Sequence, residues 1–406
     1  MKQIMAVLIL CVLSGCTTNN KEELAPNPPM GWNSWNWFGK NDINESLIYG
    51  VIDALVDSGL KDAGYEYVVI DGGWRDVKLG ENGELLAHPV KFPNGIKPLA
   101  DYAHSKGLKI GLHTVPGTED CGGDPVGSYG HEEIHIQQFV DWDIDFVKLD
   151  KCKFRDGWDE NTLKDTYFKW SKILTEKSKG KIVLNISAYK WRDWYPEVSQ
   201  MARTTPDVGA RVNSNWSSGS TFELRNDTLK KEGGYYSVMD IAEENNKWAK
   251  FAGKGYWNDP DMLVTGDHGL TFEQQKSHFA LFCIMSSPLM LGNNPIEMSR
   301  EERQIILNKT AIMVDQDPSE QGMRIKGNLH TEVWAKHLTG GRVAVLLLNK
   351  NNDTPMEMEL KLSDLGLSGE FFVNDIFQEK KLENISDAMS YKIPQGASMF
   401  VLLSKK

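Results

Sequence analysis

Excess positive charge, long apolar segments and cysteine are all scarce in this chain of 406 residues. The formal net charge is −11, which argues against nucleic acid or an anionic membrane surface as a partner. After residue 20, no apolar run is long enough to cross a membrane. Neither a tandem repeat nor a low-complexity tract is present. With 40% hydrophobic residues, the chain can build a full core and fold as one large domain with a smaller one.

The amino-terminal residues MKQIMAVLILCVLSGCTTNN combine a lysine, a short apolar run and the sequence LSGC. The apolar run is too short to span a bilayer and is typical of a secretory signal. LSGC resembles a bacterial lipobox, so we expect residues 1–25 to be a lipoprotein signal and tether with Cys16 as the lipidation site. A plain signal peptide is the alternative. The protein would then be exported and anchored at the periplasmic membrane or cell surface of a Gram-negative bacterium, with no other membrane contact.

Short apolar segments recur over the first 290 residues and alternate with helix-like stretches such as residues 45–64 and 96–108. Runs that are apolar on both faces and alternate with helices are typical of parallel strands in βα units. Eight such units predict an α/β fold, a (β/α)₈ TIM barrel, over residues 26–320. An open doubly wound sheet is the alternative, but no glycine-rich phosphate loop follows the first strand. The expected strands are residues 30–35, 65–71, 109–115, 145–150, 181–187, 201–208, 255–263 and 282–292.

The pattern changes after about residue 320, where strand-like segments follow one another without intervening helices. Turn-separated strands of this kind predict a small antiparallel β-sandwich domain over residues 321–406. Its expected strands are residues 331–338, 342–349, 356–362, 369–377 and 397–404.

The stretch FVKLDKC, residues 146–152, places an ammonium, a carboxylate and a thiol on alternate positions of an expected buried strand. Residues two apart on a strand share a face, so Lys148, Asp150 and Cys152 should point the same way. Active sites of (β/α)₈ barrels lie where the strands end, and polar or aromatic side chains end most of the strands here. They are Trp32, Asp71, Trp74, His113, Lys148, Asp150, Ser187, Arg203, Asp207, Trp257, Asp259 and Asp261.

Two chemistries fit a pocket of carboxylates with aromatic walls: a divalent metal site, or glycoside hydrolysis by a pair of carboxylic acids. Metal sites favour clustered ligands at short spacing, and HEEIH at residues 131–135 does not have the metalloprotease order. Lysine, arginine and tryptophan accompany the acids, and these residues donate to sugar hydroxyls and stack on sugar rings. We therefore favour a glycosidase that binds no metal and no cofactor.

The motifs MGWNSWNWFG, FVKLDKC, RTTPDV and WNDPDMLVTGDHGLTFEQQKSHFALFCIMSSPLMLGNN, together with IILNKTAIMVDQDP, resemble the signatures of glycoside hydrolase family 27. This family comprises α-galactosidases and α-N-acetylgalactosaminidases. The resemblance runs from about residue 26 to the end of the chain. It implies a retaining double displacement in which Asp150 is the nucleophile and Asp207 is the general acid/base.

The resemblance also implies substrate-binding roles and a disulfide. Lys148 would donate to sugar hydroxyls and help to keep Asp150 ionised. Cys152 matches the half-cystine of the family, and Cys121 lies at the place of its partner. Cys283 is expected to be a buried free thiol. The other implied sugar-binding residues are Trp32 as a hydrophobic wall, Asp71 for the 4- and 6-hydroxyl side, Arg203 for the 2- and 3-hydroxyls, and Asp261 as a second pocket acid.

Three departures from the family pattern leave the identity of the sugar open. The usual DDCW is DGGW here, with Gly72 in place of a sugar-binding aspartate. His113 replaces a usual tyrosine. This histidine is also the nearest candidate by sequence to replace the sugar contact that the missing aspartate would make. The usual CEW is replaced by NISAYKW, in which Ser187 and Ala188 resemble the N-acetylgalactosaminidase branch.

We expect an exo-acting retaining α-galactosidase that hydrolyses terminal α-D-galactosyl residues of oligo- or polysaccharides. The alternatives are a β-L-arabinopyranosidase, an α-N-acetylgalactosaminidase or an exo-glycosidase acting on a modified galactose. A glycan-binding lipoprotein without catalysis is the non-enzyme alternative. The expected partner is a carbohydrate substrate, and the sequence does not indicate the oligomeric state.

Overall fold

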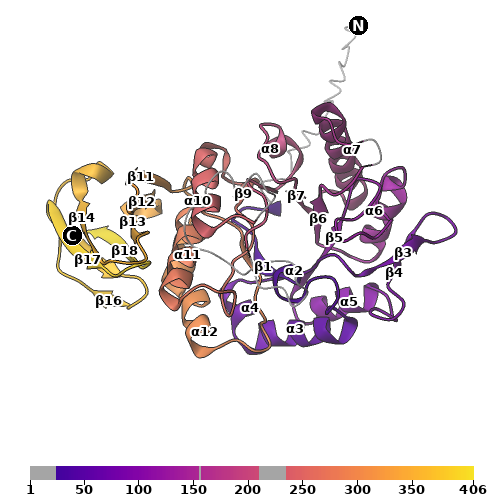
Figure 1. Ribbon diagram of the computed structural model, residues 1–406, viewed down its shortest axis with the longest axis horizontal. Coiled ribbons are helices and arrows are strands. Elements are labelled where there is room, and N and C mark those ends of the chain that lie inside the picture. Colours follow the sequence, from indigo (N-terminus) through magenta and orange to yellow (C-terminus); the bar gives the residue numbers. More distant parts are fainter. Residues whose placement is uncertain (1–23, 155–156, 210–234) are drawn as a thin grey trace, which may run out of the picture.

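The computed structural model describes residues 24–154, 157–209 and 235–406 (Figure 1). The expected signal and the lipidation site Cys16 lie outside these residues. Among the described residues, no helix combines the length and the apolar character needed to span a membrane.

The amino-terminal part of the described chain is the expected (β/α)₈ barrel. Its parallel strands follow the order β10-β1-β2-β5-β6-β7-β8-β9. The ring closes just after β9, where Leu263 forms a parallel bridge to Leu291 of β10. The strands are β1 Met30–Asn33, β2 Tyr67–Ile70, β5 Lys109–Thr114, β6 Phe146–Asp150, β7 Val183–Ser187, β8 Met201–Arg203, β9 Trp257–Asp259 and β10 Leu289–Leu291.

Helices surround the barrel, and a hairpin extends from the connection after β2 (Figure 1). The helices are α2 Trp35–Phe38, α3 Glu45–Asp57, α4 Leu60–Ala63, α5 Lys97–Ser105, α6 Glu132–Asp141, α7 Glu160–Ser178, α8 Tyr195–Val198, α10 Val238–Lys247, α11 Phe272–Ile284, α12 Arg300–Ile306 and α13 Lys309–Asp315. The hairpin pairs β3 Arg75–Leu79 with β4 Leu85–Ala87.

The local sequence explains where individual helices begin. Asn44 caps α3 by accepting a hydrogen bond from the Leu47 backbone N–H. Thr271 and Gln274 form a capping box at the start of α11, so each side chain satisfies a backbone donor of the first turn.

The alternation of side chains along each strand divides the barrel into two cores. Tyr67 and Val69 of β2 belong to a small apolar cluster with Phe146 of β6, inside the barrel. Val68 and Ile70 belong to the large core between strands and helices. Parallel neighbours in register share a face, so Asn33, paired with Val69, points inward.

The carboxyl-terminal part is an antiparallel β-sandwich, as expected. A six-stranded sheet, β11-β12-β13-β18-β15-β16, packs one face on the pair β14-β17. The six strands are β11 Met323–Gly327, β12 Thr331–His337, β13 Val343–Asn349, β15 Phe371–Asp375, β16 Lys380–Lys381 and β18 Ser398–Lys405, and the pair is β14 Met356–Lys361 and β17 Ala388–Ile393.

Helix α11 lies between the barrel and this sandwich (Figure 1). Residues 277–284 are all buried, because one side of the helix meets the barrel and the other meets β13 and β18. Burial on every side removes the helical period from the sequence. This explains why residues 282–292 were wrongly predicted as one strand: residues 282–284 end α11, and only Leu289–Leu291 form β10.

Candidate active site

A pocket opens where the barrel strands end, at the carboxyl end that the fold class uses for catalysis. It brings together six of the predicted catalytic and substrate-binding residues and the predicted half-cystine Cys121, and adds residues that the sequence did not single out. Its lining is Trp35, Asn36, Asp71, His113, Asp120, Cys121, Lys148, Asp150, Tyr189, Asp207, Asp261 and Met262.

Lys148 is buried beside Asp71 and donates to it. The Lys148 Nζ lies 2.7 Å from Asp71 Oδ2, and the Asn33 side-chain amide donates to the same oxygen at 2.8 Å. Burial alone would raise the pKa of Asp71, but the charges of Lys148 and His113 outweigh it, and the net pKa is well below the usual range. For Lys148, burial opposes the charged form, whereas Asp71 and Asp150 raise the pKa above its ordinary value. The lysine is therefore a fixed cation beside Asp150.

Asp150 ends β6 with its side chain facing into the barrel, on the same face as Lys148 and Phe146. One carboxylate oxygen, Oδ2, lies 3.4 Å from His113 Nε2. The other, Oδ1, is buried and accepts no hydrogen bond from the described residues. A buried carboxylate oxygen without a donor can attack an electrophile without first losing a hydrogen bond.

Asp207 lies at the mouth of the pocket, and its side chain is 40% exposed. Arg203, at the end of β8, holds it: one guanidinium nitrogen donates to Asp207 Oδ1 at 3.0 Å. The second terminal nitrogen of Arg203 lies 2.9 Å from Asp261 Oδ1. Arg203 is itself 2% exposed, and it lines a small neighbouring cavity of about 20 Å³ together with Asp261, rather than the wall of the pocket. It therefore orients two carboxylates in this structure.

Asp261 is a buried acid in a strained conformation. Its backbone φ is 80°, which a non-glycine residue rarely adopts and which costs of order 1–3 kcal/mol. Burial is the largest cause of a raised pKa at Asp261. The charge of Arg203 lowers the pKa, whereas the neighbouring carboxylates of Asp207 and Asp259 raise it, and the resulting pKa is about 7. Tyr189 also lies in the left-handed region, with φ 59°. Strain at two pocket residues is typical of a functional site.

A disulfide joins the loop after β5 to the end of β6 and confirms the predicted pair Cys121–Cys152. Cys121 lines the pocket, and its Sγ lies 3.4 Å from the Tyr189 hydroxyl. The disulfide thus forms part of the wall next to Asp150. Cys283 is free and buried, as expected.

The prediction that Trp32 forms the hydrophobic wall is wrong in this structure. Trp32 is fully buried, donates its indole N–H to the Asn293 carbonyl, and packs in the core outside the barrel. Strand alternation is the reason, because Asn33 faces inward and its neighbour must face outward. The aromatic residue that lines the pocket is Trp35, at the start of α2.

Ser187 does not line the pocket either, although it pairs in register with Asp150. It is fully buried, and its hydroxyl has no hydrogen-bond partner among the described residues. Tyr189, two residues further along, reaches the pocket instead. The sequence analysis also missed Asp120, which precedes the half-cystine Cys121 and could have been found from that position.

The two groups of possible metal ligands, one in the pocket and one in HEEIH, do not favour metal binding. His113, Asp150 and Cys152 form the one cluster of three possible ligands among the described residues, but the Cys152 sulfur is bonded to Cys121 and is no thiolate. In HEEIH, His135 makes hydrogen bonds through both ring nitrogens, to Ser128 Oγ and to the Gly83 carbonyl. That histidine is a structural residue.

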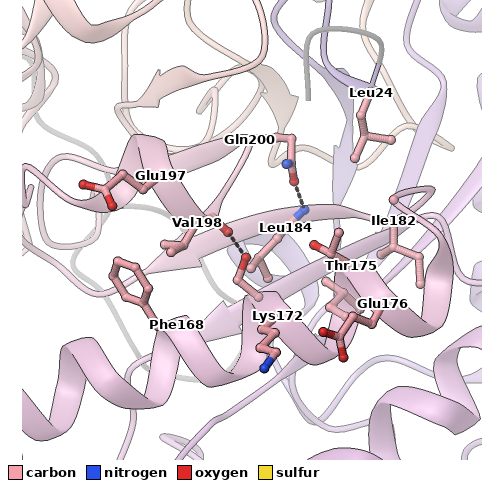
Figure 2. Close-up of a pocket in the computed structure, with 13 residues that line it drawn as sticks. Leu24, Phe168, Lys172, Thr175, Glu176, Ile182, Leu184, Glu197, Val198 and Gln200 are labelled. Atoms are coloured by element: carbon pink, nitrogen blue, oxygen red, sulfur yellow. Dashed lines mark hydrogen bonds between the residues drawn. The ribbon is translucent and has the colours of Figure 1, made fainter. Parts of the chain in front are cut away.

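A larger cavity lies at the other end of the barrel, where the strands begin (Figure 2). Its volume is about 350 Å³, against about 90 Å³ for the pocket at the strand ends. Leu24, residues of α7 and the starts of β7 and β8 line it, and Gln200 closes one side by accepting from the Leu184 backbone N–H at 2.8 Å. It contains none of the predicted site residues, so its size does not make it the active site.

Comparison with known proteins agrees with this geometry. Residues 27–317 match the family described as Alpha galactosidase A, and residues 330–403 match the Alpha galactosidase C-terminal beta sandwich domain. The chain belongs to glycoside hydrolase family 27. It is 35% identical to Alpha-galactosidase 2 of Arabidopsis thaliana over 393 residues, which cover 94% of this chain and 91% of that protein. Family membership makes the chain a glycoside hydrolase.

Two further relatives come from other kingdoms. Alpha-galactosidase A of Cellvibrio japonicus is 35% identical over 372 residues, covering 89% of this chain and 85% of that protein. The crystal structure of alpha-galactosidase I from Mortierella vinacea superposes with a TM-score of 0.87 at 30% identity, covering 95% of this chain and 98% of that chain. Family 27 members of this kind therefore share both the barrel and the sandwich with this chain.

Proposed function

We propose that this chain is an exo-acting retaining α-galactosidase. The observation that carries the proposal is one pocket at the strand ends that holds Asp150 with a free oxygen and Asp207 anchored by Arg203. Met262 lines the pocket and belongs to the apolar cluster inside the barrel, so the pocket is bounded by packed side chains on its inner side, which supports action on the end of a glycan. The relatives named alpha-galactosidases, at about 35% identity over most of the chain, support galactose as the sugar.

The proposed mechanism is a double displacement. Asp150 attacks the anomeric carbon while Asp207 gives its proton to the glycosidic oxygen, so the aglycone leaves and a glycosyl ester forms. Asp207 then removes a proton from water, which attacks the anomeric carbon and releases Asp150. Lys148 keeps positive charge beside Asp150 throughout, which favours the ionised nucleophile.

Other sugars remain as second candidates because of particular residues. Gly72 carries no side chain on the 4/6 side, which favours β-L-arabinopyranose, a sugar without C6, or a galactose modified there. The sequence likeness of Ser187 and Ala188 to the N-acetylgalactosaminidase branch favours an N-acetyl group, but both residues are buried behind Tyr189 in the pocket lining.

The test is kcat/KM on matched aryl α-D-galactoside, α-N-acetylgalactosaminide and β-L-arabinopyranoside. We expect the galactoside to be hydrolysed best. A preference of more than about tenfold for another sugar, some 1.4 kcal/mol in transition-state binding, would reassign the substrate and leave the mechanism intact. Failure to hydrolyse any of the three, with binding of galactose retained, would favour the glycan-binding alternative.

For localisation, we propose an exported lipoprotein with Cys16 lipidated, supported by the apolar run and LSGC that precede and include it. Metabolic labelling with a radioactive fatty acid should label the wild-type protein and fail to label Cys16→Ser. Equal labelling of both proteins would contradict the proposal.

A further inference from the structure

Gly72 stands where the resemblance to the family implies an aspartate that binds the 4/6 side of the sugar, so one expected carboxylate is missing there. It follows Asp71 directly, and its backbone is not in the left-handed region, so nothing in its conformation demands glycine. The absence of a side chain therefore needs another explanation. The inference below rests on the proposed function, because it concerns the same pocket and sugar.

Asp120 occupies the neighbourhood of the missing side chain. A Cβ atom built on Gly72 would lie 3.8 Å and 3.9 Å from the two carboxylate oxygens of Asp120, and 3.3 Å from the Trp35 ring. Asp120 lines the pocket together with Asp71 and Trp35. The carboxylate reaches this place from the loop after β5, about fifty residues further along the chain.

Other residues hold the Asp120 carboxylate in place. Arg75 forms a buried ion pair with Oδ2, and the Gly122 backbone N–H donates to Oδ1 at 2.7 Å. The next residue, Cys121, is tied to Cys152 by the disulfide. A carboxylate has about four acceptor positions, so both oxygens can still accept hydrogen bonds from a ligand.

We propose that Asp120 supplies the carboxylate that position 72 lacks and accepts hydrogen bonds from the sugar hydroxyls on the 4/6 side, next to Asp71. Burial raises the pKa of Asp120, but the charges of Arg75 and His113 outweigh this and lower it below the usual value, so the group is an acceptor at neutral pH. Sugar specificity then depends on a loop residue instead of the residue after β2.

The proposal predicts that positions 72 and 120 exclude one another. An aspartate at position 72 would place a second carboxylate against Asp120, and like charges at this distance in a buried site repel. That repulsion would occur whether Asp120 binds the sugar or only holds Arg75, so Gly72→Asp alone does not separate the two roles. The separating comparison is Gly72→Asp/Asp120→Asn against Asp120→Asn: an aspartate at position 72 returns a carboxylate to the sugar side of the pocket without restoring the Asp120–Arg75 ion pair, so it should rescue activity only if Asp120 binds the sugar.

The experiment measures kcat/KM on an aryl α-D-galactoside and the inhibition constant of free galactose for four variants. We expect Asp120→Asn to lower kcat/KM by roughly 10–100-fold, the usual cost of removing a charged acceptor from a buried hydroxyl. Gly72→Asp should also lower it, while Gly72→Asn, which adds the same bulk without charge, should lower it less. The double variant Gly72→Asp/Asp120→Asn should be more active than either single variant, and failure to exceed Asp120→Asn would overturn the proposal.

Asp124→Asn is the matched control, because Asp124 lies on the same loop and pairs with Lys40 but does not line the pocket. It should stay within about twofold of wild type, because Asp124 lies outside the pocket and its pair with Lys40 is long, at 3.4 Å. Circular dichroism of each variant checks that it is folded. If Asp120→Asn fails to fold, the inhibition constant of galactose for Gly72→Asp still tests the proposal, because tighter binding than in wild type would overturn it.

Two further results would overturn the proposal: a folded Asp120→Asn with wild-type kcat/KM, or a Gly72→Asp that binds galactose more tightly than wild type. Failure of the proposed function is a separate result, because wild-type enzyme would then not hydrolyse the α-galactoside at all.

Discussion

The imidazole of His113 bridges two carboxylates: its Nε2 lies 3.4 Å from Asp150 Oδ2, and its Nδ1 lies 3.7 Å from Asp120 Oδ2. Burial of the ring favours the neutral form, but Asp71, Asp150 and Asp120 together outweigh it, and the pKa of His113 is raised. A protonated imidazole can donate from both nitrogens. At the position where the resemblance implies a tyrosine, this chain thus places an imidazole whose pKa is raised by the carboxylates around it, next to the nucleophile.

This raised pKa predicts a specific dependence of stability on pH. Because the pKa of His113 is higher in the folded state, the folded protein holds the proton over a range in which the unfolded chain has released it. The contribution is complete below the unfolded pKa of about 6.5 and is lost as pH rises through the folded pKa. The free-energy difference between wild type and His113→Gln, measured by urea unfolding, should therefore be larger at pH 6 than at pH 9. A difference that grows with pH would show that His113 is neutral in the fold.

The two catalytic aspartates should fail in different ways. Asp150→Ala should abolish turnover on every substrate, because no glycosyl ester can form. Asp207→Ala should lose roughly 10²–10⁴-fold on alkyl galactosides, but less on aryl galactosides with good leaving groups, which need little protonation. Steady-state rates on a series of leaving groups check this, with Asp207→Asn as the isosteric variant. Near-wild-type activity of Asp150→Ala would refute the nucleophile assignment.

Substitution of Trp35 should mainly lower substrate binding, whereas substitution of Trp32 should mainly lower stability. Trp35→Ala removes the aromatic side of the pocket, so kcat/KM should fall while the melting temperature changes little. Trp32→Phe removes a buried indole and its hydrogen bond to Asn293, which should cost about 1–3 kcal/mol of unfolding free energy. Its kcat/KM per folded molecule should stay near wild type. A large fall in kcat/KM of Trp32→Phe, with little change for Trp35→Ala, would support Trp32 as the residue that lines the pocket.

The barrel could be predicted from the sequence because apolar runs and helices alternate strongly in it. The sandwich was equally readable, since its strands are separated by short turns. The helical end of the run 282–292 could not be read, because α11 is buried from two sides and carries no polar face. The error at Trp32 has a different origin: the motif does not specify which face of β1 its tryptophan occupies, and Asn33 takes the inward face.

The chemistry at the end of β6 was also readable from the sequence. Alternation on one strand was enough to put Lys148 and Asp150 on one face. The predicted Cys121–Cys152 pair could have placed Asp120 near the nucleophile, but its contact with Gly72 depends on how the loop after β5 folds back over the pocket. No period or motif encodes that contact, and only the prediction that Cys121 pairs with Cys152 brought the loop near the nucleophile.

The Cys121–Cys152 disulfide should stabilise both the fold and the site. It joins residues 31 apart in sequence, for which the chain-entropy model gives roughly 3–4 kcal/mol. Cys121→Ser/Cys152→Ser should lose unfolding free energy of that order. Because Cys121 lines the pocket next to Asp120, kcat/KM should also fall at temperatures where the variant is fully folded.

Treatment with a thiol reductant is the control for this prediction. Reductant should lower the melting temperature of wild type toward that of the double variant and leave the double variant unchanged, because Cys283 is free in both proteins. Wild-type protein in which mass spectrometry finds both cysteines as free thiols after export would contradict the prediction. A double variant with lost stability but wild-type kcat/KM would show that the pocket loop keeps its shape without the disulfide, with Arg75 and the Gly122 backbone N–H positioning Asp120.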